Sequence, residues 1–310
     1  MMLELICFGI FLTTNPTSEL QTELENFIST CSAEIGVAII TDGGDTICVN
    51  GESPYPLHSV AKLHQAIAIA DHLNNNEVPL ETKLAIQARE LQPDTFSPLR
   101  DQHPSDDFSI TIAELLKFSL QQSDNNACDL LFNRLLGINA TNTYIQSLGI
   151  EHFAIRHDER AMHENPKCAG ENWSTPKDAA KLIYALFTSY RFENPYHRYV
   201  KSLLWGCETG KNRLAAPLSN TKTRLAHKTG TGFDSEIGHP QEINDVGFVE
   251  LPDGRHYAIA VFMKNSANEL QTSEKMIADI SEIVFRHFSQ SIYSQEGYNN
   301  MVETFIRHII

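Results

Sequence analysis

The chain has 310 residues with 42% hydrophobic content, enough to bury a sizeable core in one large domain or two interleaved ones. Its formal net charge of −15 argues against nucleic acid and anionic membranes as partners, because both would repel an acidic protein. No stretch is long and apolar enough to predict a membrane span. A small anionic substrate stays compatible, since a local cluster of cations can outweigh the global field.

The first residues have part of the pattern of a secretory signal. Residues 5–12 form an apolar run, but no Lys or Arg precedes Lys62 and no Ala-x-Ala cleavage site follows. We interpret residues 1–17 as a degraded or truncated signal segment, which predicts a periplasmic or secreted protein. The alternative is an N-terminal apolar segment that docks on the domain.

The predicted elements run in the order helix, strands, helices, strands, helix. Ser18 caps a helix with an apolar face of Leu20, Leu24, Phe27 and Ile28. Helical patterns dominate from Ser59 to about Tyr199, and Thr111-x-x-Glu114 is a capping box within them. Alternating or turn-bounded runs predict strands at 35–41, 46–50, 224–228, 245–251 and 256–264, and a closing amphipathic helix is predicted at 273–288.

This order predicts an α+β fold in which a helical insert interrupts an antiparallel sheet flanked by terminal helices. Residues 18–58 and 205–290 would form a discontinuous α/β part, and residues 59–204 an all-helical part. Residues 291–310 form a C-terminal extension, where Met301, Phe305, Ile306 and Ile309 suggest a short amphipathic helix. A site is expected between the two parts, because pockets favour domain interfaces.

Three short motifs occur in a fixed order: Ser59-Val60-Ala61-Lys62, Ser123-Asp124-Asn125 and Lys228-Thr229-Gly230. A Ser-x-x-Lys pattern alone should occur about once by chance in a chain of this length, and this chain carries two decoys, at Ser174 and Ser219. Each tripeptide should occur in well under about one chain in ten. The ordered trio therefore carries the signal, although each member alone would be read as a helix cap or a surface residue.

The residue types fit one serine-based active site. Ser59 and Lys62 lie one helical turn apart, so the amine can hydrogen-bond the hydroxyl, and the helix N-terminus favours developing negative charge. Ser123 would shuttle a proton towards a leaving nitrogen, and the Asn125 amide would hold a substrate carbonyl. Lys228 and Thr229 offer a cation and a hydroxyl, and Gly230 is predicted to leave room for a substrate along the strand.

The motif set is that of class A β-lactamases and penicillin-binding proteins. The chain further resembles the PER-type extended-spectrum subgroup of class A. Glu159-Arg160-Ala161-Met162-His163 with Glu171-Asn172-Trp173 is similar to its omega loop, which falls in the 59–204 part. Asp94-Thr95-Phe96-Ser97-Pro98 is similar to its gatekeeper segment, and residues 244–247 and 251–254 match its last hairpin. The resemblance covers about residues 18–290 and implies a β-lactamase/transpeptidase-like fold with a five-stranded antiparallel sheet.

The resemblance implies that a monomer without metal or cofactor hydrolyses the β-lactam ring of penicillins and cephalosporins through a serine acyl-enzyme, giving antibiotic resistance. Ser59 would be the nucleophile, Lys62 its proton acceptor or the holder of its hydrogen-bond network, Ser123 the relay to the lactam nitrogen, and Glu159 the activator of the hydrolytic water. The backbone N–H groups of Ser59 and Thr231 would form the oxyanion hole. The implied substrate-binding residues are Phe96, Asn125, His163, Arg213, Lys228, Thr229, Gly230 and Thr231.

The sequence departs from the common class A pattern at His163, where most class A enzymes carry Asn and the PER-type subgroup carries His. It also departs in residues 233–244 and in the extension 291–310, and the run from Arg213 to Lys228 is one residue longer than in relatives. The competing hypothesis is a penicillin-binding D-Ala-D-Ala peptidase or transpeptidase, and Glu159 separates the two because only a lactamase needs a dedicated deacylation base. A non-catalytic peptidoglycan-binding homologue should have lost a catalytic residue, and none is missing.

Metal-based chemistry finds no support in the sequence. The six cysteines show no C-x-x-C or Cys/His metal spacing and are interpreted as buried apolar thiols, with one disulfide as an open alternative. The thirteen histidines include no H-x-H-x-D cluster, which excludes a metallo-β-lactamase.

Overall fold

The computed structural model describes residues 16–232 and 238–307, with side chains up to residue 289. The predicted signal segment lies almost wholly outside the described residues. In the part of the chain that is described, no helix is long and apolar enough to cross a membrane.

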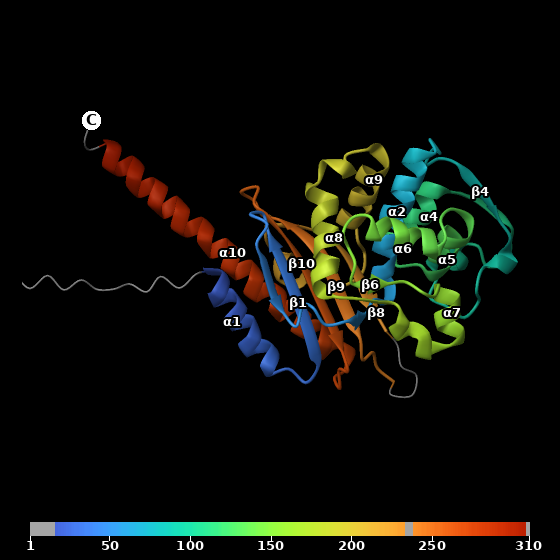
Figure 1. The fold of residues 1–310 in the computed structure, drawn as a ribbon, viewed down its shortest axis with the longest axis horizontal. Helices are drawn as coiled ribbons and strands as arrows, with labels where there is room; N and C mark the ends of the chain where they lie inside the picture. Colours follow the sequence, from blue (N-terminus) through green and yellow to red (C-terminus); the bar gives the residue numbers. More distant parts are fainter. Residues whose placement is uncertain (1–15, 233–237, 308–310) are drawn as a thin grey trace, which may run out of the picture.

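A five-stranded antiparallel sheet forms the centre of the molecule, in the order β2-β1-β10-β9-β8 (Figure 1). Its strands are β1 (Glu34–Thr41), β2 (Thr46–Val49), β8 (Arg224–Thr231), β9 (Ile243–Glu250) and β10 (His256–Lys264). The central strands carry continuous apolar runs, as expected for strands that are covered on both faces. The predicted five-stranded α+β architecture is therefore confirmed, and β8 lies at an open edge of the sheet.

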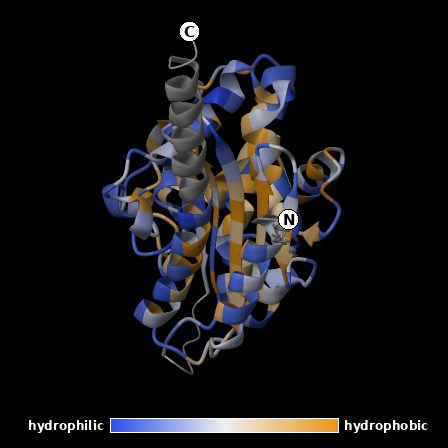
Figure 2. Ribbon diagram, turned by 90° about the vertical axis from the view of Figure 1, so that its left-hand side faces the viewer, coloured by the Kyte–Doolittle hydropathy of each residue, from blue (hydrophilic) through white to orange (hydrophobic). Residues whose placement is uncertain are grey.

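The two terminal helices cover one face of the sheet and lie side by side there (Figure 1). Leu20 and Leu24 of α1 (Pro16–Ser29) and Ile277 and Ile280 of α10 (Leu270–Arg307) are fully buried in this core. The predicted closing helix and the C-terminal extension form this single helix α10, because no proline intervenes to stop it. In Figure 2 the hydrophobic residues concentrate along the strands behind these helices.

The opposite face carries the helical part, in which α8 packs on β1 and β10 and α2 lies at the centre of the bundle. The longer helices are α2 (Ala61–Asn75), α4 (Ile112–Gln121), α5 (Asn125–Arg134), α6 (Ile138–Gln146), α8 (Pro176–Thr188) and α9 (Pro195–Trp205). Two short helices, α3 (Pro98–Gln102) and α7 (Glu159–Glu164), border the site. The predicted capping box on α4 is present.

This helical part also carries two small sheets. One pairs β3 (Tyr55–Pro56), β7 (Trp173–Ser174) and β6 (Phe153–Ala154), and the other pairs β4 (Lys83–Ile86) with β5 (Phe108–Thr111). The first of these sheets joins the residues just before Ser59 to the loop that carries α7. It therefore helps to fix the two segments on which the predicted nucleophile and Glu159 lie.

Candidate active site

Ser59 lies in a single 3-10 turn, His58–Val60, that leads directly into α2. One turn later Lys62 is fully buried, and its Nζ donates to Ser59 Oγ (2.8 Å), Asn125 Oδ1 (2.8 Å) and Glu159 Oε1 (2.5 Å). These three bonds use all three ammonium donors. The structure thus brings together four of the predicted site residues around one nitrogen atom.

The charge state of Lys62 follows from this environment. Burial lowers the pKa of Lys62, but the Glu159 carboxylate outweighs this effect, so that the pKa is raised. Lys62 is therefore an ammonium ion in the resting site and donates to Ser59 rather than accepting its proton. The 2.5 Å bond to Glu159 is the contact through which that ammonium proton can leave.

Ser123 lies at the junction of α4 and α5 and has a backbone φ of +61°, which is rare for a residue other than glycine. Its neighbour Asp124 caps α5 by accepting from the Ala127 N–H (2.8 Å) and also accepts from the Leu99 N–H (2.6 Å). The Asp124 carboxylate thus joins the start of α5 to α3, and backbone strain such as that at Ser123 concentrates at functional sites.

Asn125 joins the second motif to the predicted gatekeeper segment. Its amide Nδ2 donates to Thr95 Oγ1 (2.8 Å), and its backbone N–H donates to the Phe96 carbonyl (3.1 Å). The Phe96 ring itself is 61% exposed. The Asn125 Oδ1 atom accepts from Lys62, and one of the two Nδ2 hydrogens is donated to Thr95. The second Nδ2 hydrogen therefore remains for a substrate carbonyl.

Glu159 is the first residue of α7, which Asp158 caps by accepting from the Ala161 N–H (2.8 Å). Asp129, on α5, accepts from the backbone N–H groups of Glu159 (2.8 Å) and Arg160 (2.9 Å). Burial and the nearby charges of Asp158 and Glu159 raise the pKa of Asp129 to about 7. Asp129 was not predicted, although its i, i+4 spacing from Asn125 places both on one face of α5.

Asn172 was quoted only as part of the omega-loop motif, and no role was predicted for it. Its Oδ1 accepts from the Arg156 (2.7 Å) and His157 (3.0 Å) N–H groups, and its backbone carbonyl accepts from the Leu57 N–H (2.8 Å). It therefore ties the loop that carries Glu159 to the turn that carries Ser59. His163 lies one turn beyond Glu159, but its side chain is exposed, and within the described residues no hydrogen bond joins it to Glu159.

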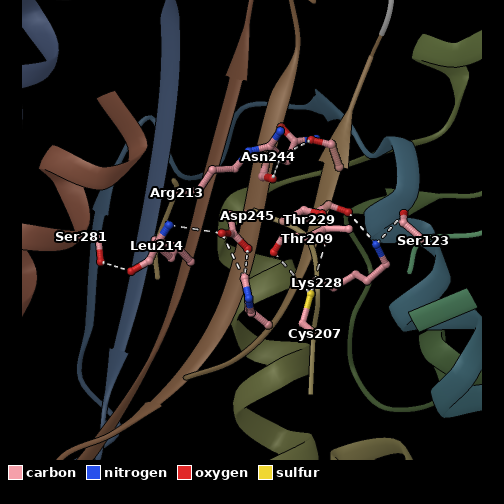
Figure 3. Close-up of polar contacts among 12 residues, drawn as sticks. Ser123, Cys207, Thr209, Arg213, Leu214, Lys228, Thr229, Asn244, Asp245 and Ser281 are labelled. Carbon is pink, nitrogen blue, oxygen red and sulfur yellow. Dashed lines mark hydrogen bonds and ion pairs between the residues drawn. The ribbon is translucent and has the colours of Figure 1, made fainter. Parts of the chain in front are cut away.

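Lys228 extends from β8 towards the helical part and is fully buried. Its Nζ donates to Ser123 Oγ (2.9 Å) and to the Thr229 carbonyl (2.9 Å), as Figure 3 shows. Burial, and then the positive charge of Lys62, lower the pKa of Lys228 to about 7. The third motif thus meets the second through a lysine–serine pair.

The role predicted for Gly230, to leave room for substrate, does not match the geometry. A Cβ atom at Gly230 would lie 2.6 Å from the Leu57 carbonyl oxygen and 3.2 Å from Asn244 Nδ2. The space is filled by the chain itself, and the glycine lets β8 approach the turn that carries Ser59. That approach also positions the next residue, Thr231.

The Thr231 N–H points out of the open sheet edge. The Gly232 N–H donates to the Glu242 carbonyl (2.9 Å) on the β9 side, and successive N–H groups of a strand point to opposite edges. The Ser59 N–H lies in the first turn of a helix, where N–H groups lack an intrahelical acceptor. These two donors are the pair predicted for the oxyanion hole.

Arg213 is buried behind β8 (Figure 3). Its guanidinium bonds to Glu274 Oε1 (3.1 Å), to the carbonyls of Gly230 (3.0 Å) and Asn244 (3.1 Å), and to Thr231 Oγ1 (2.7 Å). Four of its five N–H groups are therefore engaged. One N–H therefore remains for the predicted contact of Arg213 with a substrate carboxylate, and one hydrogen bond joins the guanidinium to the Thr231 side chain.

The remaining groups outside this cluster do not suggest metal chemistry. Among the described residues, no group of three or more His, Cys, Asp or Glu side chains is arranged to hold a metal ion. The five described cysteines, Cys31, Cys48, Cys128, Cys168 and Cys207, are all free. Three of them are partly exposed, and Cys7 lies outside the described residues.

Comparison with known proteins agrees with this geometry. Residues 19–288 match the model of the "Beta-lactamase enzyme family". A β-lactamase of Bacteroides uniformis is 36% identical over 283 residues, covering 90% of this chain and 94% of the relative. The extended-spectrum β-lactamase PER-1 of Pseudomonas aeruginosa is 30% identical over 287 residues, covering 91% of each chain.

Solved structures give the same result at the level of the fold. A class A β-lactamase from Bacteroides cellulosilyticus superposes with a TM-score of 0.85 at 31% identity, covering 89% of this chain and 99% of that one. The TLA-1 extended-spectrum β-lactamase also reaches a TM-score of 0.85, at 32% identity, covering 88% of this chain and 99% of that one. The chain therefore belongs to the β-lactamase enzyme family and is a PER-like class A β-lactamase.

Proposed function

We propose that Ser59 opens the β-lactam ring to form an acyl-enzyme and that Glu159 activates the water that hydrolyses it. The observation that carries this proposal is the Lys62 ammonium, which bonds Ser59 Oγ and Glu159 Oε1 at once. One buried group thus links the nucleophile to a carboxylate on a separate loop.

Acylation requires a group to accept the Ser59 proton. Because Lys62 already holds its proton, it becomes a base only after passing one to Glu159 across the 2.5 Å bond. The other route has Glu159 accept the proton directly through a bound water. In both routes the proton ends on the Glu159 carboxylate, and Ser59 Oγ bonds to the lactam carbonyl carbon.

Ring opening also needs a proton on the lactam nitrogen when its bond to the carbonyl carbon breaks. Ser123 Oγ supplies it and recovers a proton from Lys228 Nζ, which donates to Ser123 Oγ. The proton held by Glu159 then passes through solvent back to Lys228, which leaves Glu159 ionised for the second step. The N–H groups of Ser59 and Thr231 bind the carbonyl oxygen. Arg213 holds Thr231 in place for this role, and Lys228 with Thr229 binds the substrate carboxylate.

Deacylation distinguishes a lactamase from a penicillin-binding peptidase with the same three motifs. Glu159 Oε1 lies one hydrogen bond from Lys62 Nζ, which is itself one hydrogen bond from Ser59 Oγ. The ionised Glu159 takes a proton from a water whose oxygen bonds to the ester carbonyl carbon. The bond from that carbon to Ser59 Oγ then breaks, and Ser59 Oγ recovers the proton that Glu159 took. The direct test compares benzylpenicillin hydrolysis with D-alanine release from a D-Ala-D-Ala peptide by the same purified protein. We expect fast penicillin turnover and little D-alanine release; the reverse ranking would make the chain a peptidase.

Lys228→Ala should lower kcat/KM for benzylpenicillin by an amount equal to about 2–4 kcal/mol, the range for one pre-organised electrostatic partner. The reason is that Lys228 serves both the carboxylate and Ser123. The matched control is Lys222→Ala, because Lys222 is an exposed lysine in a decoy Ser-x-x-Lys motif. A change of less than about threefold in Lys228→Ala would remove Lys228 from the mechanism.

Substrate binding should weaken as the pH rises through neutrality. With a pKa of about 7, Lys228 is mostly an ammonium ion below that pH and mostly a neutral amine above it. KM for a carboxylate substrate should therefore rise above pH 7, by up to about tenfold one unit above the pKa, because only the charged fraction binds. Steady-state kinetics across this range gives the profile, and a KM that stays flat up to about pH 8.5 would contradict the assignment.

The setting of the enzyme follows from the sequence rather than from the fold. We propose that the enzyme works in the periplasm or outside the cell, on the basis of the signal-like apolar residues 5–12, and that it is a monomer, as the family resemblance implies. Cell fractionation of the natural host tests the location, and light scattering of the purified protein tests the oligomeric state.

A further inference from the structure

A chain of polar side chains lies behind β8, on the face opposite Lys228. Strand alternation places His227 and Thr229 on this face, and Asp245 of β9 lies directly opposite Thr229 in the register. His227 Nδ1 bonds to both oxygens of Asp245 (2.9 and 3.2 Å), and all three residues are buried. None of these contacts belongs to the proton path around Ser59.

Cys207, which follows α9, extends this series of contacts between side chains to Thr229 of β8. Its thiol interacts electrostatically with His227 and lies 3.4 Å from Thr209 Oγ1, closer than to the Thr209 carbonyl oxygen (3.7 Å). Thr209 Oγ1 in turn lies 2.6 Å from Thr229 Oγ1 (Figure 3). The order of contacts is therefore Asp245, His227, Cys207, Thr209, Thr229. It ends on the hydroxyl assigned above to the substrate carboxylate.

The segment that carries Cys207 and Thr209 is held firmly against the strand. Gly210 has a φ of +70°, and a Cβ atom there would lie 2.4 Å from Thr229 Cγ2. Asp245 Oδ2 also accepts from the Leu214 N–H (3.3 Å), and the Leu214 carbonyl accepts from Ser281 Oγ of α10 (2.9 Å; Figure 3). The segment is thus tied both to the sheet and to the terminal helix behind it.

We propose that Cys207 is a positioning residue for the substrate carboxylate, acting through Thr209 to set the direction in which the Thr229 hydroxyl donates. The proposal rests on the proposed role of Thr229 in binding that carboxylate. Each hydroxyl has a single O–H to donate, so only one of the two threonines can be the donor in the hydrogen bond between them. The protonation state of the Cys207 sulfur determines which threonine is the donor.

With a proton on sulfur, the S–H donates to Thr209 Oγ1, Thr209 donates to Thr229, and the Thr229 O–H is free for the carboxylate. With a thiolate, Thr209 donates to sulfur and Thr229 must donate to Thr209. The substrate carboxylate then faces an oxygen lone pair. Loss of the proton from Cys207 therefore weakens carboxylate binding without touching the nucleophile.

The surroundings of the sulfur make both states accessible. The charged group that faces it is His227 of β8, with Asp245 of β9 behind it, and Lys228 adds its positive charge from the other face of β8. Burial alone would raise the pKa of Cys207, but the positive charges of His227 and Lys228 outweigh it and lower the pKa to about 7. At Cys31, Cys48 and Cys128 burial is the largest effect and outweighs the nearby lysines of the last two, so the pKa of each thiol is raised.

The test compares Cys207→Ala, which removes the donor, with Cys207→Ser, which keeps one. KM and kcat are measured with benzylpenicillin and with its methyl ester, which lacks the carboxylate charge. We expect Cys207→Ala to raise KM for the acid by about three- to tenfold with kcat changed less than about twofold, and to leave the ester unaffected. Cys207→Ser should restore most of the wild-type KM, because its hydroxyl can donate to Thr209.

Three further variants make the outcome decisive. Cys31→Ala, a partly exposed thiol on the far face of the sheet, should behave as wild type. Thr209→Val breaks the chain at its next link and should reproduce Cys207→Ala, which also covers the case that Cys207→Ala fails to fold. Thr229→Val should raise KM for the acid; if it does not, the proposed role of Thr229 fails.

If Thr229→Val raises KM for the acid but Cys207→Ala and Thr209→Val do not, the proposal for Cys207 is overturned while the carboxylate site stands. An equal effect of Cys207→Ala on acid and ester would make the residue structural only, and would overturn it too. The pH profile adds a further readout: KM for the acid should rise less steeply with pH in Cys207→Ser than in wild type. The part of the rise that belongs to Lys228 should remain.

Discussion

Ser59→Ala should abolish β-lactam turnover, with a loss on the order of 10⁶ in kcat by analogy with other serine hydrolases. The change removes the atom that bonds to the lactam carbonyl carbon and leaves the backbone N–H groups of the oxyanion hole in place. Lys62 loses one of its three acceptors but keeps Asn125 and Glu159, so the fold should survive. The measurements are steady-state hydrolysis and intact-mass labelling with benzylpenicillin.

The matched control is Ser219→Ala, since Ser219 heads a decoy Ser-x-x-Lys motif, is exposed and bonds only to the Ala216 carbonyl in the described structure. That variant should hydrolyse and label as wild type. A penicilloyl adduct that still forms on Ser59→Ala would move the nucleophile to another residue.

Glu159→Gln should leave a covalent acyl-enzyme on Ser59 that persists for minutes or longer, with steady-state turnover reduced by at least about 10³. Glutamine keeps the size of the side chain and an oxygen that can accept from Lys62, but it cannot take a proton from water. The loss of the carboxylate also removes the charge that raises the pKa of Lys62, so the neutral Lys62 amine becomes accessible and can accept the Ser59 proton without Glu159. Acylation should therefore continue while deacylation stops.

Glu164→Gln serves as the control, because Glu164 is an exposed glutamate at the other end of the same short helix α7. It should show normal turnover and no persistent adduct. If Glu159→Gln deacylated as fast as wild type, the role of Glu159 would have to pass to another group.

The parts of the fold that could be predicted from sequence are those with a strong local pattern. The apolar run of 35–41 predicted β1, and the capping box at Thr111 predicted the start of α4. The helical spacing from Ser59 to Lys62 predicted the side-chain contact that the structure shows. The meeting of the three motifs followed from the family resemblance, because no local rule brings residues 59, 123 and 228 together.

The sequence could not predict the orientation of a side chain whose partners lie far away in the chain. Arg213 was expected to bind the substrate carboxylate, and no local pattern predicted that Glu274, 61 residues away, and the Gly230 and Asn244 carbonyls also bind its guanidinium. Gly230 was expected to leave room for the substrate. A glycine in a sequence indicates that space is needed beside the backbone, but it does not indicate which group fills that space. Here the Leu57 carbonyl fills it.

The supporting residues were missed for a related reason. Asp129 and Asn172 make their bonds to backbone N–H groups of a loop, and no side-chain pattern in the sequence marks such acceptors. Cys207 was interpreted as an ordinary apolar thiol, because its partner His227 is 20 positions away and on another element. A buried polar residue is recognised only when the fold reveals its partner.

The measurement that tests the account most directly is time-resolved intact mass spectrometry of the wild-type protein mixed with excess benzylpenicillin, with product quantified in the same samples. We predict that penicilloic acid accumulates far beyond one equivalent of enzyme, while the adduct on Ser59 disappears once substrate is exhausted. A stoichiometric adduct that persists, with product formation ending near one equivalent, would contradict hydrolysis by this site.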